Sequence, residues 1–273
     1  MASVVTTING MDFHYEVFNA RMEETVVLLH GFTGSTKTWH EVVELMPTTK
    51  RIILIDLIGH GQTASPKQLH FYTMKEQVEL LEAFFNWKGI QTFSLVGYSM
   101  GGRVALAYAM KYPARIEKLV LESSSPGLES LEDREARMES DQLLASRIEE
   151  AGVETFVDYW QDIPLFKSQK KLSEAQQKAI RQERLQQSAI GLANSLRGMG
   201  TGRQKSYWRE LSNFEKPVVL LSGELDKKFI KKAEQMAALF PQCDHQTILG
   251  VGHAIHVENP QSFATIVKEQ LYL

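Results

Sequence analysis

Residues 93–110 read FSLVGYSMGGRVALAYAM, and this stretch decides the fold. Its first four residues predict a buried strand, and the residues from Met100 onward predict a helix. Between them lies Gly-Tyr-Ser-Met-Gly, a G-x-S-x-G sequence in a strand–turn–helix setting. Such a turn raises the serine hydroxyl above the sheet, and its glycines let strand and helix approach closely. The sequence therefore predicts that Ser99 is a catalytic serine.

Outward from this stretch, short apolar runs alternate with helical patterns. Continuous β-branched runs are typical of strands covered on both faces, so we expect an α/β fold with a mostly parallel central sheet flanked by helices. The predicted strands are Phe13–Phe18 (at a sheet edge), Thr25–Leu29, Ile52–Ile55, Phe93–Val96, Leu119–Leu121, Val218–Leu221 and His245–Leu249. The predicted helices are Thr36–Leu45, Met74–Trp87, Met100–Lys111, Lys228–Phe240 and Pro260–Leu271.

One region interrupts this alternation. From about Pro126 to Leu211 there is no strand pattern, and the stretch is polar, helical in period and rich in Glu, Gln, Arg and Lys. Because strands resume at Val218, we expect a helical lid inserted over the carboxyl edge of the sheet. The predicted domains are a core of residues 1–125 and 212–273 and a lid of residues 126–211.

The composition is that of an ordinary globular protein. The chain has 273 residues, 43% of them hydrophobic and 23% charged, and a formal net charge of −3. Nothing global therefore favours nucleic acid or a membrane surface. With Cys243 as the one cysteine, we expect no disulfide within the chain, no metal site and no cofactor. We expect a cytoplasmic protein, because no signal peptide or membrane span is visible; its oligomeric state is open, with a monomer plausible.

An acid and a base are predicted on two later loops. Asp226 follows the strand at 218–221, and His253 follows the last predicted strand, so the chain order Ser99, Asp226, His253 fits a hydrolase triad. Histidine suits a base because its usual pKa lies near operating pH. Glu224 and Glu122 compete for the role of the acid, and His256 competes for the role of the base.

Two backbone amides are predicted to stabilise a developing anion. The amide of Met100 lies at a helix N-terminus directly after Ser99. The second amide is predicted at Phe32, in the loop LLHGFTGS of residues 28–35, because that loop joins a buried strand to a helix.

These motifs together resemble the α/β-hydrolase fold family over nearly the whole chain. They are HGFTGS (30–35), DLIGHG (56–61), GYSMGGR (97–103), GELD (223–226) and GHAIHVENP (252–260). Since this fold supports many chemistries, the resemblance implies the architecture and the Ser–Asp–His machinery without the reaction.

A narrower resemblance is to the 2-succinyl-6-hydroxy-2,4-cyclohexadiene-1-carboxylate synthases of menaquinone biosynthesis. This resemblance rests on three features. They are the arginine four residues after Ser99, the segment SPGL (125–128) followed by REAR (134–137), and FVDYW (156–160) followed by PLF (164–166). This resemblance implies substrate contacts at Tyr98, Arg103, Arg137, Trp160 and Arg184. Arg134 is an alternative to Arg137.

The arginines also indicate the kind of substrate, independently of the family resemblance. Arg103 lies on the first turn after the serine, and the arginines of the predicted lid include Arg134, Arg137, Arg147, Arg181, Arg184 and Arg197. Guanidinium groups pair carboxylates through two parallel hydrogen bonds, so a small polycarboxylate is the expected substrate.

The resemblance implies a lyase that eliminates pyruvate from 2-succinyl-5-enolpyruvyl-6-hydroxy-3-cyclohexene-1-carboxylate, with Ser99 acting as a base. The alternative is a serine hydrolase, an esterase or carbon–carbon bond hydrolase, acting on a small acidic substrate with Ser99 as nucleophile or activator of water. A ligand receptor without catalysis is disfavoured because all three triad positions are occupied.

Overall fold

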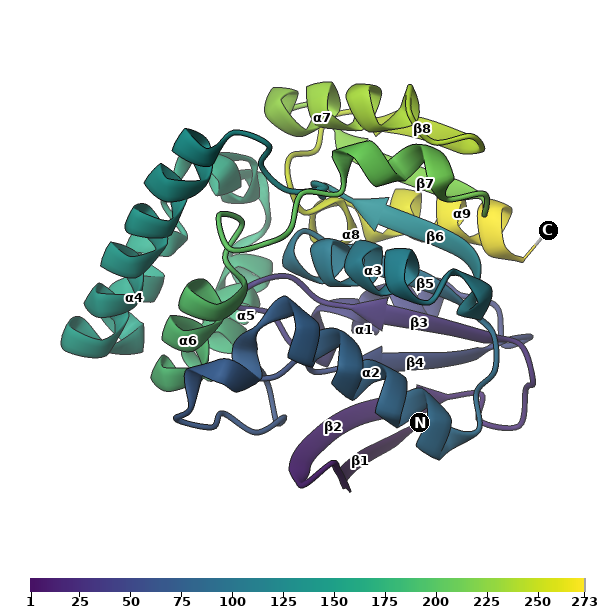
Figure 1. Ribbon diagram of the computed structural model, residues 1–273, viewed down its shortest axis with the longest axis horizontal. Helices are drawn as coiled ribbons and strands as arrows, with labels where there is room; N and C mark the ends of the chain where they lie inside the picture. Colours follow the sequence, from purple (N-terminus) through teal and green to yellow (C-terminus); the bar gives the residue numbers. More distant parts are fainter. Residues whose placement is uncertain (273) are drawn as a thin grey trace.

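A computed structural model describes residues 1–272, and its centre is one eight-stranded sheet (Figure 1). In spatial order the strands are β1 (Ala2–Ile8), β2 (Met11–Phe18), β4 (Arg51–Ile55), β3 (Thr25–Leu29), β5 (Phe93–Tyr98), β6 (Ile116–Glu122), β7 (Val218–Gly223) and β8 (Cys243–Ile248). Strand β2 is antiparallel to both its neighbours, β1 and β4, and all other neighbouring strands are parallel. The predicted α/β fold with a mostly parallel sheet is confirmed.

The predicted edge strand at 13–18 is not at the edge. It forms part of β2, and β1 pairs along its whole length from Ala2↔Val17 to Ile8↔Met11. The hairpin turn between them is Asn9-Gly10, with φ of 51° and 78°. A two-residue turn with positive φ at both positions favours an Asn-Gly pair, so this dipeptide was the available signal for the missed strand.

Helices cover both faces of the sheet. In Figure 1, α2 (Met74–Lys88) and α3 (Met100–Lys111) lie in front of the sheet, and α1 (His40–Leu45) and α9 (Pro260–Leu271) lie behind it. The apolar faces of these helices pack into two separate clusters, one on each side of the strands. The remaining core helices are η1 (Thr36–Trp39), η2 (Leu69–Tyr72), η3 (Pro113–Arg115), α7 (Lys227–Ala237) and α8 (Ile255–Glu258).

Residues 126–211, here called the helical insertion, lie between β6 and β7. They form α4 (Leu131–Trp160), η4 (Pro164–Lys171), α5 (Glu174–Leu185), α6 (Ala189–Met199) and the start of η5 (Trp208–Asn213). Side chains of Ser130, Ser173 and Ser188 cap the three α-helices by accepting backbone N–H groups. The parallel strands point toward the side where α4, α5 and α6 gather (Figure 1). The expected lack of strands here is confirmed, whereas the division into two domains stays a prediction.

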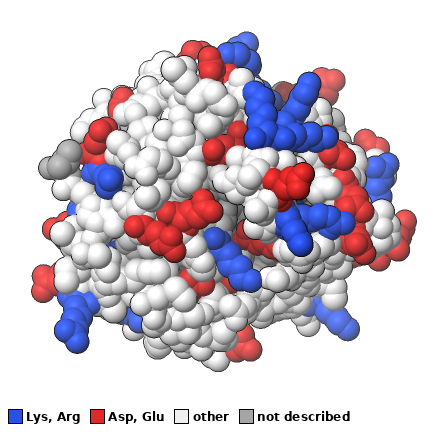
Figure 2. All heavy atoms as spheres, turned by 180° about the vertical axis from the view of Figure 1, so that it is seen from behind, with Lys and Arg blue, Asp and Glu red and all other residues white. Residues whose placement is uncertain are grey.

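Charged side chains are mixed over the surface. On the face shown in Figure 2, basic groups lie beside acidic ones. Within residues 1–272, no helix has the length and apolar character needed to cross a membrane.

Asp56 ties the loop after β4 to its surroundings. It is 1% exposed, and its carboxylate accepts hydrogen bonds from His14 Nδ1 (2.6 Å), Thr36 N (2.7 Å) and Gln62 N (2.9 Å). Burial alone would raise the pKa of Asp56, but these hydrogen bonds together lower it below its usual value. The carboxylate of Asp56 thus binds within its own loop and also joins that loop to β2 and η1.

We expect Asp56→Asn to lower the free energy of unfolding by roughly 3 kcal/mol, because an amide cannot accept all the hydrogen bonds that His14, Thr36 and Gln62 donate to the buried carboxylate. Since the pKa of Asp56 is lowered in the fold, this stabilisation exists above the unfolded pKa and disappears as the pH falls. Urea unfolding at pH 7 measures the loss. The matched control is Asp244→Asn at an exposed site, expected to change stability by under about 0.5 kcal/mol. Equal midpoints for the two variants would contradict the prediction.

Candidate active site

Ser99 occupies a sharp turn between β5 and α3. Its φ of 50° and ψ of −104° lie outside the regions that L-residues prefer. The turn is held by a bond from Ser99 N to Glu122 O on β6 (2.8 Å). A Cβ on Gly101 would lie 2.4 Å from the carbonyl oxygens of Leu29 and His30, so only glycine lets α3 begin this close to β3.

His253 and Asp226 converge on Ser99. His253 Nε2 lies 3.0 Å from Ser99 Oγ, and His253 Nδ1 lies 2.6 Å from Asp226 Oδ2. A carboxylate only accepts, so Nδ1 carries the proton and Nε2 is free to accept one from the serine hydroxyl. His253 is 1% exposed, and the rings of Phe229 and Phe166 pack against it at 4.7 and 6.2 Å between centroids. This arrangement can move a proton between Ser99 and the imidazole.

The competing residues are engaged elsewhere. Glu122 is completely buried and pairs with His256 Nδ1 at 2.8 Å, while His256 Nε2 contacts Thr38 Oγ1 at 2.9 Å. Glu224 accepts the amide of Gly250 at 2.9 Å. Glu122 and His256 thus form a buried histidine–carboxylate pair of their own. Asp226 is the carboxylate that contacts His253.

Both residues predicted for the anion-stabilising amides border the space beside Ser99. Met100 is the first residue of α3, where a backbone N–H has no partner within the helix. The Phe32 amide has no hydrogen-bond acceptor among the described residues. Two free amides next to the serine hydroxyl are what an oxyanion would require.

A cavity of about 410 Å³ opens over Ser99. Eight of the ten predicted site residues line it, and a ninth, Asp226, contacts His253 in the wall. The wall itself includes Phe32, Tyr98, Ser99, Met100, Arg103, Arg137, Trp160 and His253. Burial raises the pKa of Tyr98 well above its usual value, so its phenol stays protonated. Trp160 Nε1 is buried without a hydrogen-bond partner within the described chain and is a free donor.

Arg103 presents a buried positive charge to this cavity. Its Nη1 donates to Met199 O (2.6 Å) and Gln204 Oε1 (3.0 Å). Burial, and then the like charge of Arg137, lower the pKa of Arg103 to about 10, so it remains charged at neutral pH. Arg137 donates from Nε to Asp141 Oδ1 at 2.8 Å and is 43% exposed. Both guanidinium groups keep unused N–H donors.

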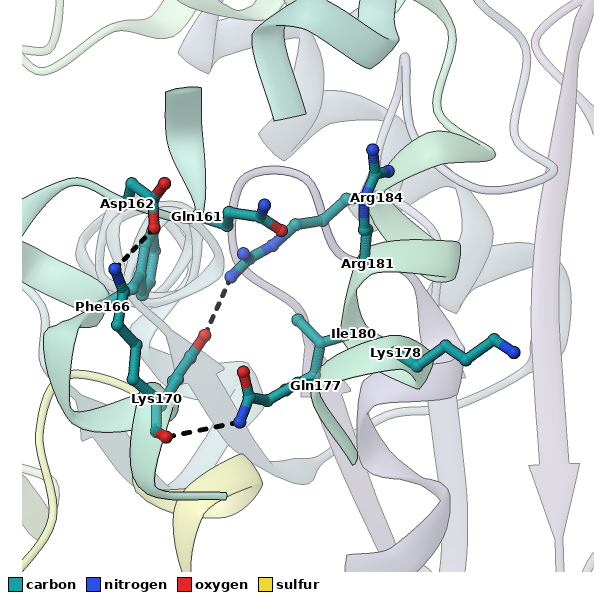
Figure 3. A pocket seen from close by; sticks show the side chains of 10 residues that line it. Gln161, Asp162, Phe166, Lys170, Gln177, Lys178, Ile180, Arg181 and Arg184 are labelled. Carbon is teal, nitrogen blue, oxygen red and sulfur yellow. Dashed lines mark hydrogen bonds and ion pairs between the residues drawn. The ribbon is translucent and has the colours of Figure 1, made fainter. Parts of the chain in front are cut away.

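Arg134 and Arg184 do not line the cavity. Arg134 Nε donates to Gly202 O at 3.0 Å, so Arg137 is the member of that pair that reaches the site. Arg184 lies in the wall of a neighbouring cavity together with Arg181 (Figure 3). Its Nη2 donates to Gln169 Oε1 at 3.1 Å, and its guanidinium lies 4.7 Å above the Phe166 ring. Phe166 borders both cavities, and Arg184 also lines a small cavity together with Phe32 and Tyr98, two residues of the wall over Ser99.

Sequence reasoning missed several residues of the wall. Ser123 and Ser195 have buried hydroxyls without a partner among residues 1–272. Lys228 and Lys232 also lie in the wall. The available signal was helical spacing after Asp226, because residues 228 and 232 share one face of α7.

Comparison with known proteins supports this assignment. A family model described as alpha/beta hydrolase fold matches residues 24–260. The fold and the serine site thus define the chain as an α/β hydrolase in architecture.

Particular relatives narrow the family. The putative 2-succinyl-6-hydroxy-2,4-cyclohexadiene-1-carboxylate synthase of Bacillus subtilis (strain 168) is 42% identical, covering 98% of this chain and 97% of its own. The synthase of Enterobacter sp. (strain 638) is 32% identical, covering 91% and 92%. The structure of MenH from S. aureus superposes with a TM-score of 0.90 at 36% identity, covering 94% and 97%. The chain belongs to the 2-succinyl-6-hydroxy-2,4-cyclohexadiene-1-carboxylate synthase family.

Proposed function

We propose that this protein eliminates pyruvate from 2-succinyl-5-enolpyruvyl-6-hydroxy-3-cyclohexene-1-carboxylate, giving 2-succinyl-6-hydroxy-2,4-cyclohexadiene-1-carboxylate in menaquinone biosynthesis. The family fits this reaction because its members carry the name of the product. The observation that carries the proposal is the basic wall of the Ser99 cavity. Four lysine and arginine side chains line it against one acid, Asp133. A substrate with three carboxylates matches that charge.

The Ser99 hydroxyl, deprotonated by His253, removes a proton from the ring. The electron pair of that C–H bond enters the conjugated system, and negative charge develops on the oxygen of the succinyl carbonyl. The bond from the ring to the enolpyruvyl oxygen then breaks. His253 returns the proton to the departing oxygen, and the enol becomes pyruvate. Atoms and charge balance without a cofactor or an acyl-enzyme.

The amides of Phe32 and Met100 stabilise the charge on the succinyl oxygen. Both border the cavity beside Ser99 and lack partners of their own. Preorganised donors of this kind contribute most when the charge exists only in the transition state. The same pair would serve hydrolysis, so the amides do not by themselves select the reaction.

The wall also supplies groups that orient the substrate. Arg103 and Arg137 bind carboxylates, and the phenol of Tyr98 and Nε1 of Trp160 are donors toward the bound molecule. Arg184 lies outside this wall but borders a small adjoining cavity with Phe32 and Tyr98, and its contact with the substrate is proposed from the family resemblance. The helical insertion acts as a lid, since Arg137, Trp160 and Ser195 reach the cavity from it.

The test is pyruvate release from the pathway substrate, with a panel of simple esters measured alongside. Release of one pyruvate per molecule of product supports the lyase. Fast ester cleavage without pyruvate, or a burst of covalent acyl-enzyme, would instead favour the hydrolase in which Ser99 attacks an acyl carbon.

Arg137→Gln is expected to raise the KM for the substrate about tenfold, because a charge-assisted hydrogen bond of about 1.5 kcal/mol is lost. Arg134→Gln is the matched control, since Arg134 lies one turn away on the same helix but outside the cavity wall. Its KM should stay within about twofold of wild type. Steady-state pyruvate release gives both values, and a larger effect at Arg134 would reverse the assignment.

A further inference from the structure

Lys228 and Lys232 form a basic pair in the wall of the Ser99 cavity. They lie four residues apart on α7, so both point to the same side of that helix. Neither has a salt bridge to an Asp or Glu side chain within residues 1–272. Lys232 is half-buried, and its Nζ lies 6.0 Å from the centre of the Trp208 ring. Two adjacent ammonium groups, neither held in a salt bridge within the described residues, form a site for an anion.

The two lysines repel each other. Burial, and then the charge of Lys228, lower the pKa of Lys232, while Asp133 on α4 opposes this shift without forming a salt bridge. Such repulsion is relieved when a carboxylate binds between the ammonium groups. The unliganded cavity therefore holds an arrangement that an anionic ligand would stabilise.

The lysines lie beside a second basic pair, that of Arg103 and Arg137. Arg137 is one helical turn, about 6 Å, along α4 from Asp133. Asp133 is the acid whose charge raises the pKa of Lys232. The cavity thus has two cationic positions, one formed by the two lysines and the other by the two arginines. With the two arginines assigned to two carboxylates, one carboxylate of the proposed substrate has no partner.

The position of α7 identifies that carboxylate. The helix begins directly after Asp226, and Phe229, the neighbour of Lys228, packs against the His253 ring at 4.7 Å. The lysines therefore share a wall with the imidazole. In the proposed reaction, His253 protonates the departing oxygen, so the enolpyruvyl group has to lie near this wall.

We propose that Lys228 and Lys232 bind the carboxylate of the enolpyruvyl leaving group. This inference rests on the proposed function. It assigns the lysines a contact with the substrate that is lost when pyruvate departs, so they distinguish substrate from product. The other two carboxylates remain on the product and stay with the arginines.

The test compares Lys228→Met with Lys232→Met, singly and combined, in steady-state pyruvate release. We expect the double variant to raise the KM for the substrate at least about tenfold. The inhibition constant of the product, which lacks the enolpyruvyl group, should stay within about twofold of wild type. Lys232→Arg should retain most of the affinity. The control is Lys231→Met, an exposed lysine on the same helix outside the wall, expected to match wild type.

Direct binding separates this inference from the proposed function. In a Ser99→Ala background, calorimetry measures the Kd of the substrate without turnover, with and without the two lysines. A tenfold weaker Kd for the substrate alone supports the lysine site. Equal losses for substrate and product, or no loss for either, would overturn it. A wild-type protein that binds the substrate but releases no pyruvate contradicts the proposed reaction only.

Discussion

Replacing Ser99 with alanine is expected to lower kcat for pyruvate release about 10³-fold, with little change in KM. The hydroxyl lies 3.0 Å from His253 Nε2 and is the group that removes the ring proton in the proposed reaction. A positioned acid–base group typically contributes 10²- to 10⁴-fold to a rate, which sets the size of the effect. Because the carboxylate contacts remain, the substrate should still bind, and the loss falls on kcat.

The control for this variant is Ser262→Ala on α9, which removes a hydroxyl away from the cavity. Its kcat should stay within about twofold of wild type, and both variants should unfold at the same temperature. If the Ser99→Ala variant kept kcat within tenfold, water or His253 alone would remove the proton. Ser99 would then be a positioning group.

Asp226→Asn should lower kcat by roughly 10³- to 10⁴-fold, although it changes only an oxygen into an NH₂ group. The carboxylate accepts the proton on His253 Nδ1 at 2.6 Å and thereby leaves Nε2 free to accept from Ser99. An asparagine amide can donate to Nδ1, which moves the ring proton to Nε2 and turns it toward Ser99. That tautomer cannot act as a base on the serine.

Glu122→Gln is the matched comparison for Asp226→Asn. It makes the same chemical change in another buried histidine–carboxylate pair, that of Glu122 with His256. We expect a lower unfolding temperature and a kcat within about tenfold of wild type, because His256 does not contact Ser99. Should Glu122→Gln lose more activity than Asp226→Asn, the carboxylate that orients the base would be Glu122.

Local patterns were enough to locate most of the core elements. The bounds predicted for α3 and α9 match the structure, and β3 begins and ends where its apolar run does. The reason is that each segment pairs a strong periodicity with a clear end signal, such as Pro260 at the first turn of α9. Strand β1 was missed because most of its side chains are exposed or only partly buried, so it has no apolar run. The turn at Asn9-Gly10 was the sequence feature that indicated a strand on either side of it.

The turn at Ser99 could be predicted from sequence because the strand, the strained turn and the helix that form it follow one another within residues 93–110. The same holds for the amide of Met100. Asp226 and His253 could be predicted because a parallel fold brings the carboxyl ends of its strands to one edge. Each residue follows a predicted strand, and their order along the chain after Ser99 fits a triad.

The tertiary structure alone decided which charged side chains share the cavity. Arg134, Arg137 and Arg184 look alike in sequence, yet only Arg137 lines the wall over Ser99. Arg184 contacts Gln169 and the Phe166 ring and borders a smaller adjoining cavity instead. Lys232 enters the wall because α7 packs beside His253. The direction in which a helical side chain points depends on how the helix is docked, and docking is set by contacts between segments distant in the chain.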